Sequence, residues 1–252
     1  MLTKNDIKFL KSLDDKKTRV ENSSFLVEGT KIVLEVLSGK SEKFRPEMLI
    51  ATDKWLTKNT LNTKVRVETA DKETMERISS LSTTPDVILQ VKYNTKFESF
   101  DIKNHSAVVL DNVRDPGNLG TIIRICNWFG INHLICSPTC ADVYNPKTLQ
   151  SSMGAFLRVQ TIYTPLAEFI AKNQEDHQIY LTTLTGESIY KTKYTKPALI
   201  IFGNEANGVS EEMQKIKHQK ITIPCMNNEG DAPESLNVAV STGIVLSEIM
   251  RQ

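Results

Sequence analysis

Short apolar runs separated by helical patterns recur through the second half of this 252-residue chain, and they constrain its fold more than any other feature. The runs lie at residues 108–110, 133–136, 179–184, 199–202 and 220–223. Each run suits a buried strand, and the segments between them leave room for crossover helices. Buried strands joined by helices form parallel sheets covered on both faces. We therefore predict an α/β fold with a five-stranded, doubly wound parallel sheet.

The first part of the chain shows the same alternation on a smaller scale. We expect a helix over 4–13, a charged turn over 14–19, strands at 25–27, 48–50, 65–67 and 87–91, and helices between these strands. This order predicts a small α/β sandwich over residues 1–95. The polar stretch that follows loses the apolar period, which indicates a linker at 96–104 and a second domain at 105–252.

The last thirty residues combine a short strand, a polar loop and an apolar helix. The strand stops at Pro224, and Ser235 is a natural cap for the helix that follows it. This helix is apolar around most of its circumference, which predicts burial or an interface. Asn237 lies just inside the expected helix start, where backbone N–H groups and the helix dipole favour an electron-rich ligand.

Composition narrows the class of protein without pointing to a function. Hydrophobic residues make up 40% and charged residues 24% of the chain, and the net charge of +1 argues neither for nor against a nucleic-acid partner. No apolar run is long enough to span a membrane and the N-terminus lacks a signal-peptide core, so we expect a cytoplasmic protein without membrane contact. The four cysteines form no CxxC pair, and we predict no metal site, although Cys136, Cys140 and His133 lie close in sequence.

Three polar clusters follow expected strands, at the edge where open α/β sheets bind ligands. They are Asn112 to Asn118 with Arg124, the segment 203–208 (GNEANG), and Pro224 with the segment 234–237 (ESLN). Taken singly, each cluster has an ordinary structural interpretation. For example, Asn118 would cap a helix over 119–130 that Gly130 closes. The chain has no GxxxxGK[ST], GxSxG or HExxH motif, which disfavours a kinase or a hydrolase.

Together and in this order, the clusters resemble the motifs of the SpoU branch of the SPOUT RNA methyltransferases. The matching segments are DNVRDPGNLGTIIRICNWFG (111–130), LIIFGNEANGVS (199–210) and ITIP with ESLNVAVSTGI (221–244). In addition, FLVEGTKIVLEVL (25–37) is similar to the substrate-binding domain, related to the ribosomal L30e fold, that many members carry. One departure is the loop MNNEGDAP (226–233), which is longer than the compact stretch usual in the family.

This resemblance implies a function and a set of site residues. It implies S-adenosylmethionine as cofactor, a deep trefoil knot in the C-terminal domain, a homodimer whose active site draws on both subunits, and methyl transfer to a ribose 2′-hydroxyl of RNA. The catalytic positions that it implies are Arg124, Asn112, Glu205, Ser235 and Asn237. The cofactor positions that it implies are Gly203, Ile223 and Leu236, with Met226 from the longer loop as a fourth candidate.

Several alternatives stay open on the sequence alone. A guanidinium is a poor base, so we expect Arg124 to stabilise the developing alkoxide, although the family has also been interpreted with this arginine as general base. Ribosomal RNA is the first expectation for the substrate and transfer RNA the second. A base methyltransferase and a non-catalytic RNA-binding protein on the same fold are the competing functions.

Overall fold

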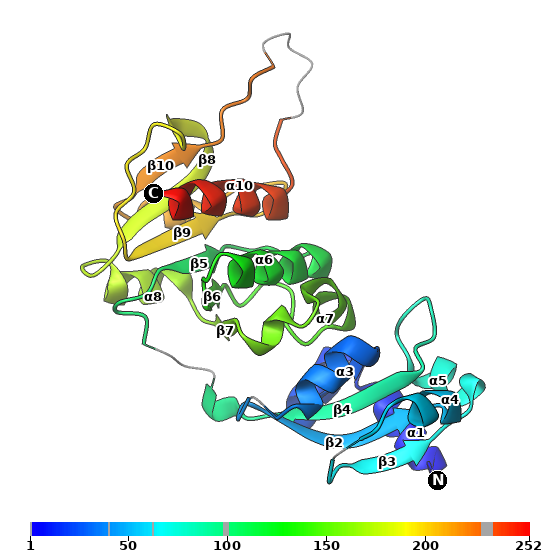
Figure 1. The fold of residues 1–252 in the computed structure, drawn as a ribbon. Coiled ribbons are helices and arrows are strands. Elements are labelled where there is room, and N and C mark those ends of the chain that lie inside the picture. Colours follow the sequence, from blue (N-terminus) through cyan, green and yellow to red (C-terminus); the bar gives the residue numbers. More distant parts are fainter. Residues whose placement is uncertain (1, 40, 62, 98–100, 228–233) are drawn as a thin grey trace.

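The computed structural model describes residues 2–39, 41–61, 63–97, 101–227 and 234–252 (Figure 1). The N-terminal unit holds α1 (Lys4–Ser12), α2 (Lys16–Asn22), β1 (Ser24–Glu28), α3 (Thr30–Leu37), β2 (Phe44–Ala51), α4 (Asp53–Lys58), β3 (Arg66–Thr69), α5 (Lys72–Ile78), β4 (Val87–Tyr93) and the 3-10 turn η1 (Thr95–Phe97). The C-terminal unit holds β5 (Ala107–Leu110), α6 (Pro116–Trp128), β6 (His133–Cys136), α7 (Pro146–Ser152), η2 (Ala155–Leu157), β7 (Gln160–Tyr163), α8 (Leu166–Asn173), β8 (Gln178–Ser188), β9 (Ala198–Phe202), α9 (Glu211–Gln214), β10 (Gln219–Thr222) and α10 (Val238–Arg251).

The C-terminal sheet is parallel throughout, as the alternation of strands and helices predicts. Its order is β10-β8-β9-β5-β6-β7, and every neighbouring pair runs in the same direction. The prediction of five strands was wrong, because β7 forms a sixth strand at the edge. Its sequence QTIY holds one aliphatic side chain, Ile162, so it does not read as an apolar run. The carboxyl ends of the six strands share one edge of the sheet, and the loops after them form a single surface.

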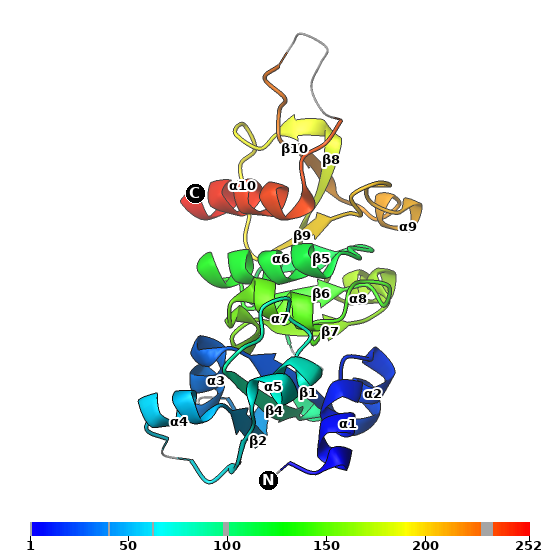
Figure 2. The ribbon, with the colours of Figure 1, turned by 90° about the vertical axis from the view of Figure 1, so that its right-hand side faces the viewer.

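Helices cover both faces of this sheet (Figure 2). Val108 and Leu110 of β5 face α6 and α10 on one side, where they join the largest apolar cluster. Ala107 and Val109, the alternate residues, belong to the cluster that includes α8 and α9 on the other side. The period of two residues in a strand explains this division. The doubly wound arrangement therefore agrees with the prediction.

The N-terminal unit is also an α/β structure, built on a four-stranded sheet of order β1-β4-β2-β3. The pairs β1–β4 and β4–β2 are antiparallel, and β2–β3 is parallel. The expected charged turn over 14–19 was wrong, because most of it belongs to α2. Asp15 caps this helix by accepting a hydrogen bond from the Thr18 N–H at 2.9 Å, and Ser23 ends it with a left-handed φ of 46°. The helix has one apolar residue, Val20, which is 59% exposed, so its sequence KKTRVEN shows no apolar period.

The two units share one apolar cluster. Tyr144, from the loop before α7, stacks on Phe25 of β1 and Tyr93 of β4 with ring centroids 4.6 and 4.4 Å apart. Beside it, Arg19 of α2 donates hydrogen bonds to Asp142 from Nε at 3.0 Å and from a terminal nitrogen at 2.6 Å. The N-terminal unit is thus packed on the C-terminal unit through stacked rings and a buried ion pair.

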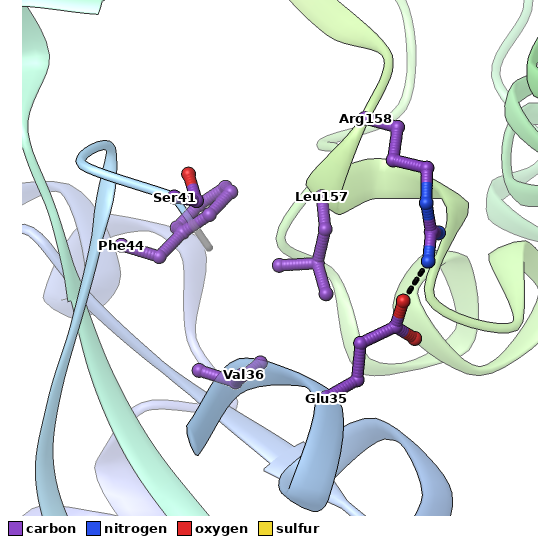
Figure 3. A pocket seen from close by; sticks show the side chains of 6 residues that line it. All are labelled: Glu35, Val36, Ser41, Phe44, Leu157 and Arg158. Carbon is purple, nitrogen blue, oxygen red and sulfur yellow. Dashed lines mark ion pairs between the residues drawn. The ribbon is translucent and has the colours of Figure 1, made fainter. Parts of the chain in front are cut away.

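A pocket of about 140 Å³ lies at the same junction (Figure 3). The N-terminal unit contributes Glu35 and Val36 of α3, Ser41, and Phe44 of β2 to its lining, and the C-terminal unit contributes Leu157 and Arg158. Arg158 forms an ion pair with Glu35 across the junction. Because its walls come from the contact between the units, this pocket is part of the junction.

The helices of the described chain are short. The longest are α10 with 14 residues and α6 with 13. None of the helices in the described residues is long and apolar enough to cross a membrane.

Candidate functional site

The site begins at the N-terminus of α6, directly after the first sheet strand of the C-terminal unit. Pro116 is the first helical residue, and Asp115 is the cap, with its Oδ1 accepting a hydrogen bond from the Asn118 N–H at 2.8 Å. Proline suits this position because its missing N–H would have no partner there. The expectation that Asn118 caps a helix over 119–130 was therefore wrong. The helix starts three residues earlier, and the side chain of Asn118 is available for other contacts.

Asn118 joins the three polar clusters through its side-chain amide. Its Nδ2 donates to Glu205 Oε1 at 2.7 Å, and its Oδ1 accepts from Asn237 Nδ2 at 3.0 Å. Asn237 Oδ1 in turn accepts from the backbone N–H groups of Ala239 and Val240 at 2.9 and 3.3 Å. Because those N–H groups can only donate, they fix which end of each amide is the oxygen. We call the hydrogen-bonded side chains of Asn237, Asn118 and Glu205 the row of amides, and at its end an amide hydrogen of Asn118 is donated to the Glu205 carboxylate.

The position of Asn237 corrects the expectation for the last helix. Asn237 is the N-cap of α10, whose first residue is Val238. Ser235 lies two residues before this cap, is exposed, and does not cap the helix. Asparagine is as good a cap as serine, and its longer side chain also reaches Asn118. Within the described residues, Ser235 makes no hydrogen bond that would bring it into the row of amides.

The loop after β9 is closed by its own backbone. The Asn204 N–H donates to the Gly208 carbonyl at 2.8 Å, and the Gly208 N–H returns a bond to the Asn204 carbonyl at 2.9 Å. A Cβ on Gly203 would overlap the backbone of Gly208 and Val209. A glycine at 203 is therefore required by the backbone of the loop itself. Closure of this loop already requires it, and the closed loop presents Glu205 to Asn118.

Asn112 lies beside the row of amides without joining it. Its φ of 63° is left-handed, and its N–H donates to the Ser137 hydroxyl at 2.9 Å. Its side-chain oxygen accepts from Arg114 Nε at 2.8 Å, and its carbonyl accepts from Asn204 Nδ2 at 2.9 Å. Asn112 thus holds the first loop to the second and places an arginine at the edge of the site.

Arg124 stands apart from Glu205 in a single protomer. It follows Asn118 by six residues in α6, so the two side chains point about 120° apart around the helix. Arg124 is exposed, and in the described part of the chain it makes no hydrogen bond or ion pair. A single copy of the chain therefore does not bring this arginine to the other expected catalytic residues.

The expected cofactor side chains lie on the two stretches that flank residues 228–233, which are outside the described residues. Met226 is 84% exposed and Leu236 47% exposed, whereas Ile223 is half-buried against the main apolar cluster. Exposed apolar side chains next to a polar row are what an adenosine ring and its ribose need from a binding surface. The residues present therefore fit a nucleoside cofactor.

Sequence reasoning gave no role to two residues that the structure places at this site, Asp115, which lies in the first polar cluster, and Lys147. Lys147 of α7 donates to Asp115 Oδ2 at 2.9 Å. Burial raises the pKa of Asp115, but the hydrogen bonds from Lys147 and from the Asn118 N–H outweigh it and leave the pKa below its usual range. An Asp-Pro pair before a helix is a start signal that could have identified Asp115. No local signal pairs residues 115 and 147.

The sequence matches two family profiles. A profile described as the SpoU rRNA Methylase family matches residues 105–247, and one described as the MRM3-like substrate binding domain matches residues 4–89. The first match contains all three polar clusters.

Relatives and solved structures agree with these matches over nearly the whole chain. The 23S rRNA (guanosine(2553)-2′-O)-methyltransferase RlmP of Bacillus subtilis is 28% identical over 95% of this chain and 94% of its own length. A solved structure from Porphyromonas gingivalis, assigned to the TrmH family of RNA methyltransferases, is 34% identical with a TM-score of 0.87 and covers 100% of this chain and 99% of that one. The AdoMet-bound rRNA methyltransferase from Sinorhizobium meliloti is 26% identical with a TM-score of 0.82 and covers 100% of this chain and 96% of that one.

Proposed function

The chain belongs to the SpoU rRNA methylase family, and on that premise we propose that it transfers a methyl group from S-adenosylmethionine to a ribose 2′-hydroxyl of structured RNA. One observation supports this function most directly. The row from Asn237 through Asn118 to Glu205 joins the three motifs by side-chain hydrogen bonds. A fold kept only for binding RNA has no need for such a row.

Ribosomal RNA is the substrate that we propose, with transfer RNA as the second candidate. The name of the B. subtilis relative specifies 23S rRNA, and that relative aligns with almost the whole of this chain. RNA-specific proteins recognise mainly unpaired nucleotides whose bases can be splayed out. Ribose methylation of such a nucleotide is the reaction that we assign to this site. We further propose that it works in the cytoplasm and needs no metal.

The side chains that would hold S-adenosylmethionine are Ile223, Met226 and Leu236, together with the backbone at Gly203. When bound, the cofactor supplies a methyl group made electrophilic by the neighbouring sulfonium. Ile223 and Leu236 would provide apolar walls, and the closed loop after β9 would present backbone groups. The contribution of Met226 depends on the loop that follows it.

Arg124 and the row of amides have different roles in the proposed mechanism. The ribose hydroxyl is weakly acidic, so its oxygen would gain negative charge as its proton leaves and would lose that charge again once the bond to the methyl carbon is complete. The guanidinium of Arg124 would stabilise that charge and hold the adjacent phosphate. Glu205, Asn118 and Asn237 would orient the ribose, with Ser235 and Asn112 in supporting positions. Holding the reacting groups in line accounts for much of such a rate.

The N-terminal unit is proposed to recognise the RNA. We assign residues 1–95 to an L30e-like substrate-binding domain, 96–104 to a linker and 105–252 to the methyltransferase domain with a C-terminal trefoil knot. The profile match over residues 4–89 supports the first assignment. Crosslinking of the full-length protein to its RNA tests it, because crosslinks confined to 105–252 would contradict an RNA-binding role for the N-terminal domain.

A homodimer would bring Arg124 into a complete site. Two apolar residues stay exposed on the paired helices α6 and α10, Trp128 at 83% and Val240 at 52%. Both side chains lie on helices that pack against each other, and exposed apolar surface of this kind can mark an interface. We propose that a second copy covers them and that Arg124 acts with groups of that copy. Sedimentation equilibrium is the test, and a monomer at micromolar concentration would contradict the proposal.

Two experiments test the function as a whole. Calorimetric titration with S-adenosylmethionine should show binding, and its absence would favour a non-catalytic RNA-binding protein. Ribosomal RNA from cells that lack the protein should then gain a ribose-methylated nucleotide when incubated with the enzyme and cofactor. Nuclease digestion followed by mass spectrometry would identify the methylated nucleotide. A ribose-methylated linkage also resists alkaline cleavage, which distinguishes it from a linkage next to a methylated base. A methylated base would contradict the ribose assignment.

A further inference from the structure

Asp115 uses its two oxygens for two different tasks. Oδ1 accepts from the Asn118 N–H at 2.8 Å and so caps α6, while Oδ2 accepts from Lys147 Nζ at 2.9 Å. A carboxylate with one restrained oxygen can still turn about its last bond. The hydrogen bond from Lys147 to the second oxygen fixes the plane of the carboxylate. It thereby also fixes the direction in which Oδ1 accepts the hydrogen bond from the Asn118 N–H.

Lys147 is itself held in place at the start of α7. The N-cap of that helix, Asn145, accepts a hydrogen bond from the Lys147 N–H at 2.9 Å through its Oδ1. The lysine side chain then reaches towards Asp115 over Gly117. A Cβ on Gly117 would stand 3.0 Å from Lys147 Cε and 2.9 Å from Asp115 Oδ1. The absence of a side chain at 117 therefore opens the path that the lysine takes.

This arrangement fixes the position of Asn118. Its backbone N–H is held by Asp115, and its side chain spans Glu205 and Asn237 at 2.7 and 3.0 Å. The two contacts lie on opposite sides of one amide group, so a small rotation of the first turn of α6 would lengthen at least one of them. The hydrogen-bond distances within the row of amides thus depend on the position of the first turn of α6, and Asp115 caps that turn.

We propose that Lys147 is a positioning residue for methyl transfer, acting through Asp115 on the side chain of Asn118. The inference rests on the proposed function, and it assigns Lys147 no contact with RNA or cofactor. The ion pair is exposed, with 59% of the lysine side chain open to solvent, so its effect on global stability is small. We expect its effect on the orientation of the Asn118 side-chain amide to be larger than its effect on global stability.

Three variants separate this role from a general effect of charge. Lys147→Met removes the ammonium and keeps the length of the side chain, and Lys147→Arg keeps a donor to Asp115. Lys172→Met makes the same charge change on α8, on the opposite face of the sheet. We expect Lys147→Met to lower kcat about tenfold, which corresponds to about 1.4 kcal/mol, with the KM for RNA and the affinity for S-adenosylmethionine within twofold. Lys147→Arg should recover most of the loss, and Lys172→Met should match the wild type.

A double-mutant cycle with Asp115→Asn decides between positioning and direct RNA contact. In the Asp115→Asn background the lysine has lost its charged partner, so Lys147→Met should lower kcat by less than twofold further. A full tenfold loss there, or a loss that appears in the KM for RNA, would overturn the proposal in favour of a phosphate contact.

Hydrogen exchange gives a readout that does not depend on catalysis. Exchange of the peptide over residues 116–122 should be faster in Lys147→Met than in the wild type and unchanged in Lys172→Met. If the wild type methylates no RNA, the proposed function fails, but this exchange difference still tests the link from Lys147 to Asn118. Equal exchange in all variants would overturn the inference itself.

Discussion

At the scale of single residues, Asn118 changes how the site is understood. The three motifs contain several polar side chains, and the sequence gives no reason to prefer one of them as the link. The structure selects Asn118 because α6 begins at Pro116, which turns the amide towards the loop after β9 and the start of α10. Ser235 and Asn112, which the motifs favour equally, stay outside the row of amides.

Arg124 is the residue on which the chemistry should depend most. Arg124→Ala should reduce single-turnover methyl transfer by at least about a hundredfold, because the charge on the ribose oxygen loses its stabilising cation. The affinity for S-adenosylmethionine, measured by calorimetry, should stay within a few-fold. A near-normal single-turnover rate on the natural RNA would remove Arg124 from the mechanism. Arg124→Lys is the matched variant, since it keeps the charge and loses the fork of donors.

Glu28 should make stability depend on pH. Burial raises the pKa of Glu28, the hydrogen bonds from the Ser79 hydroxyl and the Ser80 N–H oppose this rise, and the nearby Asp14 carboxylate adds to it. A carboxyl group whose pKa rises on folding contributes stability that is fully present below its unfolded pKa, near 4.5, and is lost as the pH rises through the folded pKa. The free energy of unfolding of the wild type minus that of Glu28→Gln should therefore fall as the pH rises above about 4.5.

Urea denaturation at a series of pH values measures this difference. Glu76→Gln, at an exposed position on α5, serves as the control. A difference between wild type and Glu28→Gln that does not change with pH would contradict the prediction.

At the scale of elements, the packing of α6 on α7 carries the site. A Cβ on Gly120 would overlap the Thr148 carbonyl and stand 2.7 Å from the Ser151 Cβ, so the two helices meet at the bare backbone of this glycine. Gly120→Ala should lower the free energy of unfolding by about 1–3 kcal/mol and reduce methyl transfer, because the helices must separate. Thermal denaturation and turnover measure the two effects.

Gly243 of α10 offers the matched control for that prediction. The nearest atom to a Cβ at this position is the Ile125 Cδ1 at 3.7 Å, an ordinary contact. Gly243→Ala should be neutral or slightly stabilising, since alanine is the better helix former. A loss of stability equal to that of Gly120→Ala would show that close packing is not the cause.

The elements also show what the sequence could and could not predict. Periodicity found nine of the ten strands that the described residues form, and the parallel direction of the strands in the second sheet, because apolar runs and long connections are local signals. It missed β7, which carries one aliphatic residue, and α2, which carries one apolar residue, Val20. It also started α6 too late and α10 too early. The site residues followed from the family motifs, but the pairing of Asp115 with Lys147 depends on how α7 packs against α6, which no local pattern records.

At the scale of the whole molecule, the ion pair between Arg19 and Asp142 fastens the two units. The side chain of Arg19 is 3% exposed and that of Asp142 is 14% exposed. Arg19→Ala should lower the free energy of unfolding by about 3 kcal/mol, because it leaves a carboxylate largely buried without its partner. Urea denaturation provides the measurement.

Lys17 and Glu21 form the matched exposed pair on the same helix, with side chains 82% and 61% open to solvent. Lys17→Ala should change the free energy of unfolding by less than about 0.5 kcal/mol. If Arg19→Ala and Lys17→Ala lower the free energy of unfolding by the same amount, burial is not the reason for the contribution of Arg19.

The stacking of Tyr144 between the units limits how this enzyme could be re-engineered. Modular exchange, in which a new RNA-reading half is fused to an existing catalytic half, works when the halves meet through a thin polar contact. Here such a fusion would strip Phe25 and Tyr93 from Tyr144 and leave aromatic rings facing water. An N-terminal half that recognises a different RNA would therefore have to keep the side chains that pack against Tyr144. For the same reason we expect the two halves to have diverged together as one inherited unit.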